Sequence, residues 1–438
     1  MPVGDIVSGY TFVPAEKNID QTKLNAIAGQ ATIAPAFISG QTPASSTGSG
    51  DYFVFLQSTG TLAKILTQDL ATSIGSSSGM TSAITAVRLR SFNAAGNPTF
   101  EVDQRQAFNG IANAPNGLTV DRWRIATAGT MKSNVQGFQG NASCFVPGTS
   151  YLISQGQLNI AVATTEPSLA AGDLYSIGQL IEGPFWRELA GDVTSISLMV
   201  QSNVAGLKFS VALRSSNAGV SLVKLCTIPS ASTWTLIPLP NLPKPTSGSF
   251  PTTPGGIAYT LDICLACGTT YIAPAADTWQ TGNFVGAPGM SNLFATSGGS
   301  FILGFIQHEP GPLCTTLIDK PFSQNLDECV RYFHKTYNYT DKPGAVTSAG
   351  VLGPVVLSAG TKAFGTFRFI KPMARIPTLT VYSWSTGAAG SLTDSNGTVH
   401  TGATCANISD SGFSDVNFAT ATAGACAAYV HYTADTGW

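Results

Sequence analysis

Hydrophobic and polar residues alternate along most of the chain, as they do in β-strands that have one buried and one exposed face. The alternation comes in short runs separated by turns rich in Gly, Pro, Ser and Asn. This pattern is typical of an antiparallel β-sandwich and in particular of a jelly roll. No repeat of fixed period is present, which disfavours the stacked turns of a parallel β-helix. The clearest alternating runs are residues 151–164, 193–202, 206–216, 257–266 and 300–309.

The same pattern predicts three regions. Residues 81–340 carry the alternating runs and form the jelly-roll sandwich. Residues 341–438 begin with a turn-rich connector and have their own hydrophobic set, which predicts a smaller C-terminal β-sandwich. Residues 1–80 predict fewer regular elements than the other two regions. They contain a short helical piece capped by Asp20, an alternating hairpin over residues 52–66 and a flexible Gly/Ser joint.

The stretch NLDECVRYFHKTYN, residues 325–338, predicts one short helix that connects the two sandwiches. In helical numbering His334 lies about 140° around the axis from Cys329, so the two side chains cannot act as a nucleophile and its base. Cys329 is therefore interpreted as a packed structural thiol. The predicted apolar face consists of Leu326, Cys329, Val330, Phe333 and Tyr337.

The other cysteines predict no metal site. Cys264 and Cys267 have the spacing of half a zinc ribbon, but they lie in an alternating run, where an offset of three places side chains on opposite faces of a strand. No second pair completes a site, so both thiols are interpreted as core residues. Cys405 and Cys426 bracket two predicted strands of the last region, and either a disulfide or two separate buried thiols fits them.

Composition narrows the class of protein. Only 11% of the 438 residues are charged, against roughly 25% in ordinary soluble domains, which suggests a surface covered by partners in an assembly. The net charge of −2 argues against binding to nucleic acid or to an acidic membrane surface. The sequence shows neither a signal peptide nor an apolar run long enough to cross a bilayer, so we expect a soluble protein made in a cytoplasm, without membrane insertion.

Catalytic chemistry is hard to place on this sequence. Asp121, Glu182 and Glu309 lie among aromatic residues or strand ends, and paired carboxylates are what glycoside cleavage requires. A carboxylate in such a position is more often the partner of a nearby arginine. We therefore predict no catalytic residue, no cofactor and no metal, and keep glycan depolymerisation as the alternative.

Tryptophans are the candidate sugar-binding residues of this chain, because sugar rings stack on aromatic faces. Trp234 and Trp279 lie beside loops and are the predicted carbohydrate-binding residues. Trp123 and Trp186 are expected to fill the sandwich core instead.

Four segments resemble, in the same order, bacteriophage tail-fibre and related virion fibre proteins. The segments are GLTVDRWRIATAG (117–129), RELAGDVTSISLMVQSNVAGLKFSVAL (187–213), FILGFIQHEPGPLCTTLIDKPFSQNLDECVRYFHKTY (301–337) and FRFIKPMARIPTLTVYS (367–383). In that family a DRW motif opens a sugar-binding-like jelly roll, and a helix with a Cys-x-Arg-Tyr centre follows the roll. The matches to the helix are Cys329, Arg331, Tyr332 and Phe333.

The segment after this helix also matches, and one position departs from the family. The matches are Met373, Arg375, Pro377 and Thr378, with an alanine inserted. His308 stands where the family usually has an apolar residue. The hairpin segment DYFVFLQSTGTLAKILTQDL (51–70) is similar to N-terminal pieces of fibre and spike proteins.

The resemblance implies a non-enzymatic structural protein of a virion, assembled in the host cytoplasm as a homotrimer. Residues 1–80 would dock on other virion proteins of the tail, the collar or the region near the portal. The distal β domains would meet the host surface, often a glycan. A tailspike-like depolymerase and a collar or head decoration without a receptor are the alternatives.

Overall fold

The computed structural model describes residues 92–438, except 140–143, 146–151, 155, 192, 319, 358–359 and 423–425, together with two strands nearer the N-terminus. By its internal contacts the chain divides into two compact units, Met1–Arg88 and Leu89–Trp438. In the first unit β1 (Tyr52–Leu56) pairs antiparallel with β2 (Leu62–Leu66), which confirms the predicted hairpin. The predicted helical piece at Asp20 and the Gly/Ser joint lie outside the described residues.

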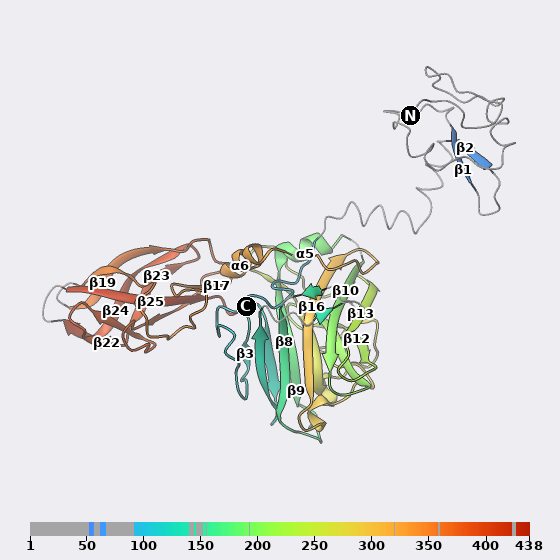
Figure 1. Ribbon diagram of the computed structural model, residues 1–438, viewed down its shortest axis with the longest axis horizontal. Helices are drawn as coiled ribbons and strands as arrows, with labels where there is room; N and C mark the ends of the chain where they lie inside the picture. The colour runs from blue at the N-terminus through green and yellow to red at the C-terminus, as the bar shows by residue number, and fades with distance from the viewer. Residues whose placement is uncertain are drawn as a thin grey trace, which may run out of the picture. The chain divides into compact units, whose positions relative to one another are not determined.

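The second unit contains an antiparallel β-sandwich, as the alternation predicts (Figure 1). One sheet has the order β13-β10-β16-β8-β5 and the other has the order β15-β12-β11-β14-β9-β4-β3. The first sheet consists of β5 (Lys132–Phe138), β8 (Gln157–Thr164), β10 (Thr194–Ser202), β13 (Thr235–Leu242) and β16 (Ser300–Pro310). The second consists of β3 (Gly117–Leu118), β4 (Arg124–Ala128), β9 (Leu174–Glu182), β11 (Leu207–Ser215), β12 (Val220–Ile228), β14 (Ile257–Cys267) and β15 (Trp279–Thr281).

Side chains of the two sheets meet in one hydrophobic core. Phe209 of β11 and Phe301 of β16 pack edge to face across it, with ring centroids 5.1 Å apart. Trp123 and Trp186 belong to this core, as predicted, and Trp123 is fully buried. The alternation therefore located the core correctly.

Helix α5 (Gly183–Leu189) is an element that the sequence analysis did not predict. Pro184 occupies its first turn, where the missing N–H of proline leaves no intrahelical hydrogen bond unmade. The helix packs against β9 and β14 and brings Trp186 into the core.

The predicted connecting helix is real but shorter than expected. Helix α6 runs over Phe322–Val330 and then ends, with the Tyr332 N–H donating to the Cys329 carbonyl. Residues Phe333–Lys335 form β17, which pairs antiparallel with the last strand. The assignment of Phe333 and Tyr337 to the apolar helix face is therefore wrong, because backbone pairing with a distant strand replaces the last turns of helix.

The C-terminal region forms a second β structure around strand β25 (Cys426–Asp435). This strand pairs with β18 and β21 near its start and with β17 and β20 near its end. A separate hydrophobic core lies among these strands, with Val381, Phe413 and Tyr432 as members. The other strands are β18 (Leu352–Leu357), β19 (Gly360–Arg368), β20 (Thr378–Tyr382), β21 (Ser391–Asp394), β22 (Val399–Thr401), β23 (Thr404–Ser409) and β24 (Gly412–Thr422).

The end of the chain is anchored against the jelly roll. Trp438 is fully buried and stacks on Tyr332, with ring centroids 5.7 Å apart. Leu180 of β9 and Ala374 complete this small apolar cluster. Within the part of the chain that is described, no helix has the length and apolar character to cross a bilayer.

Candidate functional site

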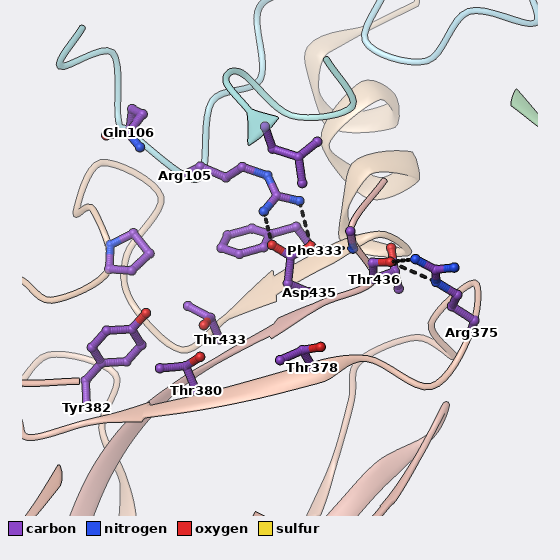
Figure 2. Close-up of a pocket in the computed structure, with 13 residues that line it drawn as sticks. Arg105, Gln106, Phe333, Arg375, Thr378, Thr380, Tyr382, Thr433, Asp435 and Thr436 are labelled. Carbon is purple, nitrogen blue, oxygen red and sulfur yellow. Dashed lines mark hydrogen bonds and ion pairs between the residues drawn. The ribbon is translucent and has the colours of Figure 1, made fainter. Parts of the chain in front are cut away.

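A polar cavity lies where β20 and β25 face the loop that carries Arg105 (Figure 2). Its volume is about 550 Å³ and it is open to solvent. Its lining combines threonine hydroxyls with Arg105, Arg375, Asp435 and Tyr382. These residues come from three distant parts of the sequence, which the fold brings together.

The register of β20 against β25 explains why threonines line the cavity. Thr378 lies opposite Asp435, and Thr380 lies opposite Thr433. Alternate residues of a strand face the same side, so the threonines and Tyr382 share one face of β20. Val381, between them, is buried in the C-terminal core. The result is a small array of hydroxyl groups and a carboxylate beside an aromatic ring.

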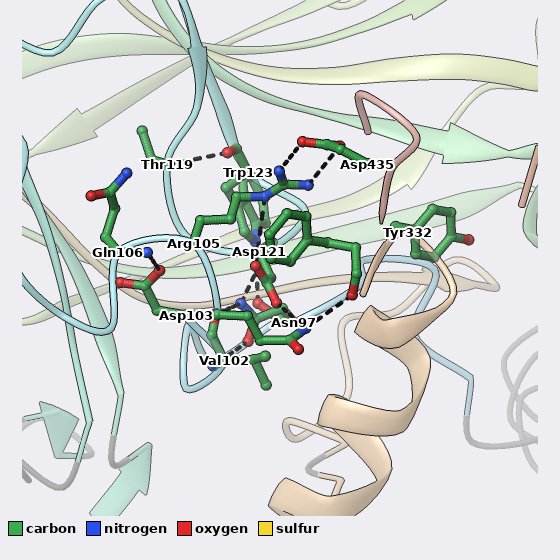
Figure 3. A network of polar contacts seen from close by, with 12 residues as sticks. Asn97, Val102, Asp103, Arg105, Gln106, Thr119, Asp121, Trp123, Tyr332 and Asp435 are labelled. Carbon is green, nitrogen blue, oxygen red and sulfur yellow. Dashed lines mark hydrogen bonds and ion pairs between the residues drawn. The ribbon is translucent and has the colours of Figure 1, made fainter. Parts of the chain in front are cut away.

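Arg105 and Asp435 fix one wall of the cavity (Figure 3). The guanidinium group donates to both carboxylate oxygens, with Nη2 3.1 Å from Oδ1 and Nη1 on Oδ2. Its carbon lies 4.1 Å from the ring centre of Phe333, a cation–π arrangement. A bidentate pair held against a ring has little freedom to rotate, so this wall is preorganised.

A buried carboxyl group lies behind this pair. Oδ2 of Asp121 accepts a hydrogen bond of 2.7 Å from Gln104, and Oδ1 lies 3.6 Å from Nε of Arg105. Burial raises the pKa of Asp121 to about 7, although Arg105 and Gln104 act in the opposite direction. Nearby, burial lowers the pKa of Lys335 to about 8. The ammonium group of Lys335 donates to three backbone carbonyls, which tie together the loops around the junction.

Arg375 also lines the cavity, beside Thr436 (Figure 2). Its Nε donates to the Thr436 carbonyl at 2.8 Å, and its guanidinium carbon lies 5.4 Å from the Trp438 ring centre. The side chain is otherwise exposed at the rim. The cavity lining thus combines hydrogen-bond donors and acceptors, which suits a ligand rich in hydroxyl groups.

The three carboxylates considered as catalytic acids are all buried and hydrogen-bonded. Asp121 accepts from Gln104 and lies beside Arg105. Glu182 accepts from Nη2 of Arg331 at 2.7 Å and from the Tyr332 hydroxyl at 2.6 Å. Burial alone would raise the pKa of Glu182, but these two donors and the Gly255 amide hold it below its usual value.

Glu309 has partners of a different kind from those expected. Its carboxylate accepts from the Gln307 amide and from the Thr315 N–H, each at 2.8 Å. The predicted arginine partner therefore applies to Asp121 and Glu182, and not to Glu309.

The predicted carbohydrate-binding tryptophans do not line this cavity. Trp234, just before β13, is half-buried and packs against the cluster of Cys144, Met199 and Phe305. Trp279, the first residue of β15, donates from its indole N–H to the Pro243 carbonyl at 2.6 Å. Trp234 precedes a strand of one sheet and Trp279 lies on a strand of the other. Sugar stacking by either residue stays a prediction.

The structure accounts for two residues that the sequence left unexplained or set aside. His308 is fully buried, with Nδ1 2.6 Å from the Tyr259 hydroxyl and Nε2 3.0 Å from the Thr194 hydroxyl. Burial lowers its pKa to about 3, so it is a neutral core residue. Cys329 is also buried, and burial raises its pKa well above the usual thiol value, as expected of a packed thiol.

The structure also shows how three other cysteines are placed. Cys264 and Cys267 were expected on opposite faces of a strand, but a register shift between Cys264 and Ala266 turns both side chains into one cluster. Cys405 is a free thiol, and the side chain of Cys426 lies outside the described residues.

The cavity residues were not found by sequence reasoning. The segment PTLTVY carries a usable signal, since its threonines alternate with apolar residues and so mark a polar strand face. Nothing local in the sequence indicates that this face meets Arg105, which lies about 270 positions earlier in the chain.

Comparison with known proteins identifies no family. No family model matches the chain, and no curated protein matches it. Several solved structures are similar to part of the chain. The carbohydrate-binding module TmCBM61, in complex with β-1,4-galactotriose, is 12% identical with a TM-score of 0.27, covering 50% of this chain and 99% of that one.

Two further structures are similar at the same level. The family 11 carbohydrate-binding module from Clostridium thermocellum, in complex with a mixed-linked tetrasaccharide, is 15% identical with a TM-score of 0.26, covering 47% of this chain and 98% of that one. The enzymatically active domain of bacteriophage CBA120 tailspike protein 4 is 11% identical with a TM-score of 0.25, covering 50% of this chain and 21% of that one. These scores are low, and the fold described above rests on the strand pairing of this chain.

Proposed function

We propose that this protein binds carbohydrate in the cavity between β20, β25 and the Arg105 loop. The observation that carries the proposal is the fixed array of Thr378, Thr380, Thr433 and Asp435 beside Tyr382. Vicinal hydroxyl groups of a sugar both donate and accept hydrogen bonds, and the array offers partners for both. Tyr382 adds an aromatic surface next to these polar groups.

We further propose that the protein is a structural component of a bacteriophage virion, a homotrimeric fibre or spike that adheres to a host-surface glycan. The resemblance of four ordered segments to virion fibre proteins supports this assignment, as does the low content of charged residues. Residues 1–80 dock on other virion proteins, and the site on β20 and β25 is carried by the distal part of the chain. The cavity residues are proposed to bind sugar through hydrogen bonds, and none of them is assigned a catalytic role.

A glycan array probed with the full chain tests the binding proposal. Thr380→Val removes one cavity hydroxyl while keeping a β-branched side chain. Loss of one net hydrogen bond of about 0.5–1.5 kcal/mol predicts binding roughly two- to tenfold weaker. Thr404→Val is the matched control, because Thr404 is exposed on β23, outside the cavity.

The array result separates the proposal from its alternatives. Binding of a host-derived glycan that is weakened by Thr380→Val and not by Thr404→Val supports the cavity. Equal binding by both variants would mean that the sugar binds elsewhere on the protein. If no glycan binds, the protein is better explained as a structural decoration without a receptor. Mass photometry of the same sample reports the trimer directly, and a monomer contradicts the fibre assignment.

A further inference from the structure

Three sulfur-containing side chains, Cys264, Cys267 and Met290, lie in one small cluster at the C-terminal end of β14. The thiol of Cys267 lies 3.5 Å from the thioether sulfur of Met290. Cys264 belongs to the same buried cluster as Cys267, because the register shift before Ala266 turns two positions of an alternating strand toward the same side. Residues three apart in a regular strand would not meet in this way. The Cys264 thiol donates to the Ala266 carbonyl at 3.5 Å.

The sulfur atoms of Cys267 and Met290 pack closely against Gly286. A Cβ atom on Gly286 would lie 2.3 Å from the sulfur of Cys267 and 2.9 Å from that of Met290, so a larger residue there would displace them. The Ser210 hydroxyl donates to the Met290 sulfur at 3.3 Å and holds that side chain in place. The walls around the group are small and apolar, and include Ala212, Ala273 and Val285.

We propose that Cys264, Cys267 and Met290 form a binding site for a soft monovalent metal ion of the Cu⁺ class. Thiolate and thioether sulfur are the ligands that Cu⁺ prefers over harder cations. Metal–sulfur distances of about 2.3 Å place three ligands of a trigonal site about 4 Å from one another. The separation of 3.5 Å between the sulfur atoms of Cys267 and Met290 is close to that requirement, and Cys264 lies in the same buried cluster.

The ligand set favours Cu⁺ over Zn²⁺. Zinc in proteins takes four ligands from Cys, His, Asp and Glu. Within the described residues, no three side chains of those types are grouped so that they could hold a metal ion. A thioether as third ligand is acceptable to Cu⁺ and poor for Zn²⁺, which is the basis of the expected selectivity.

Binding is coupled to proton release and has a route from solvent. Each bound Cu⁺ forms bonds to two thiolates and displaces their two protons to water, so affinity rises with pH. Met290 is half-buried whereas Cys264 is fully buried, so the ion enters from the side of Met290.

The test is an anaerobic titration of the reduced full chain with Cu⁺ in competition with a chromogenic Cu⁺ chelator. We expect one equivalent to bind, with a sulfur-to-copper charge-transfer band in the ultraviolet. Cys264→Ser and Cys267→Ser should each lose that equivalent. Cys226→Ser should retain it, because Cys226 is a buried thiol on β12 outside the sulfur group.

Met290→Leu keeps the proposal testable if the cysteine variants do not fold. This variant keeps the volume of the side chain and should bind Cu⁺ more weakly than the wild type. Met199→Leu, which changes a buried methionine of a different cluster, should bind like the wild type. Wild-type affinity in Met290→Leu overturns the proposal, as does retention of the equivalent by the two cysteine variants. An equally tight equivalent of Zn²⁺ overturns the assignment to a soft ion.

Discussion

The buried carboxyl group of Asp121 makes the stability of the fold depend on pH in a way that one substitution should reveal. Its pKa is about 7 in the folded protein, against 3.8 when unperturbed. Between these values the folded state binds a proton that the unfolded state has released. The contribution of Asp121 to the free energy of unfolding is therefore fully present below about pH 4. It falls as pH rises from about 4 to about 7.

The size of the effect follows from the shift. A difference of about three units corresponds to about 4 kcal/mol, at about 1.4 kcal/mol per unit. Asp121→Asn keeps an oxygen that accepts from Gln104 and carries no charge at any pH. Relative to the wild type, the variant should gain stability with rising pH, by up to about 4 kcal/mol at pH 8.

Other groups titrate nearby, so the difference between variant and wild type is the quantity to measure. His308, whose pKa burial lowers to about 3, destabilises the fold as pH falls below its unfolded value, which is the opposite slope. Lys335, with a pKa of about 8, acts at higher pH. His308 is present in both proteins, so its contribution cancels in the difference. The Asp121 carboxylate raises the pKa of Lys335, so Asp121→Asn lowers the pKa of Lys335 further, and the difference near pH 8 includes this change.

Urea unfolding followed by tryptophan fluorescence at pH 5, 6, 7 and 8 measures this difference. Asp277→Asn is the control, because Asp277 is an exposed aspartate paired with Lys224, and its difference from wild type should be flat over this range. A flat difference for Asp121→Asn, or one of opposite sign, would refute the account of the buried network behind Arg105.

Two further substitutions test the packing of the junction. Trp438→Ala removes a fully buried ring that stacks on Tyr332, and should lower the free energy of unfolding by about 3–5 kcal/mol; an unchanged urea midpoint would contradict the anchoring of the C-terminus. Cys329→Ser places a hydroxyl in a buried site and should cost about 1–3 kcal/mol, without effect on glycan binding. In the native wild type, Cys329 should resist a small alkylating reagent that modifies the half-buried Cys314, and mass spectrometry of the modified peptides would show the reverse if Cys329 were accessible.

Alternation along the sequence was a reliable guide to the strands and the core. The alternating runs 193–202, 206–216, 257–266 and 300–309 correspond to β10, β11, β14 and β16, and the inward residues include Phe209 and Phe301. The signal is local, because a strand with one buried face needs an apolar residue at every second position whatever its partner is. For the same reason it did not give the sheet order or the partner of β25.

The errors arose where a tertiary interaction overrides a local pattern. The stretch from Asn325 onward has helical spacing of apolar residues, yet Phe333 and His334 leave the helix to pair with β25. At Cys264 a single extra residue in the strand reverses the face expected for Cys267. Neither event is visible in the residues concerned, because both depend on the strand that lies alongside.

The candidate site depends even more than these strands on tertiary packing that the local sequence does not show. The sequence pointed to Trp234 and Trp279 because aromatic residues beside loops are a local signal for sugar binding. The cavity instead joins Arg105 to Thr380 and Asp435, positions that only the packing of the C-terminal strands against the jelly roll brings together. A polar strand face is detectable in sequence, whereas its enclosure into a cavity is not.

The most direct test of the central proposal is a crystal structure of the full chain with a glycan selected on the array. Our account predicts that the sugar lies between Thr380, Thr433 and Asp435, with its hydroxyl groups bonded to those side chains and Tyr382 beside the ring. A sugar stacked on Trp234 or Trp279, with the cavity of β20 and β25 empty, would contradict it.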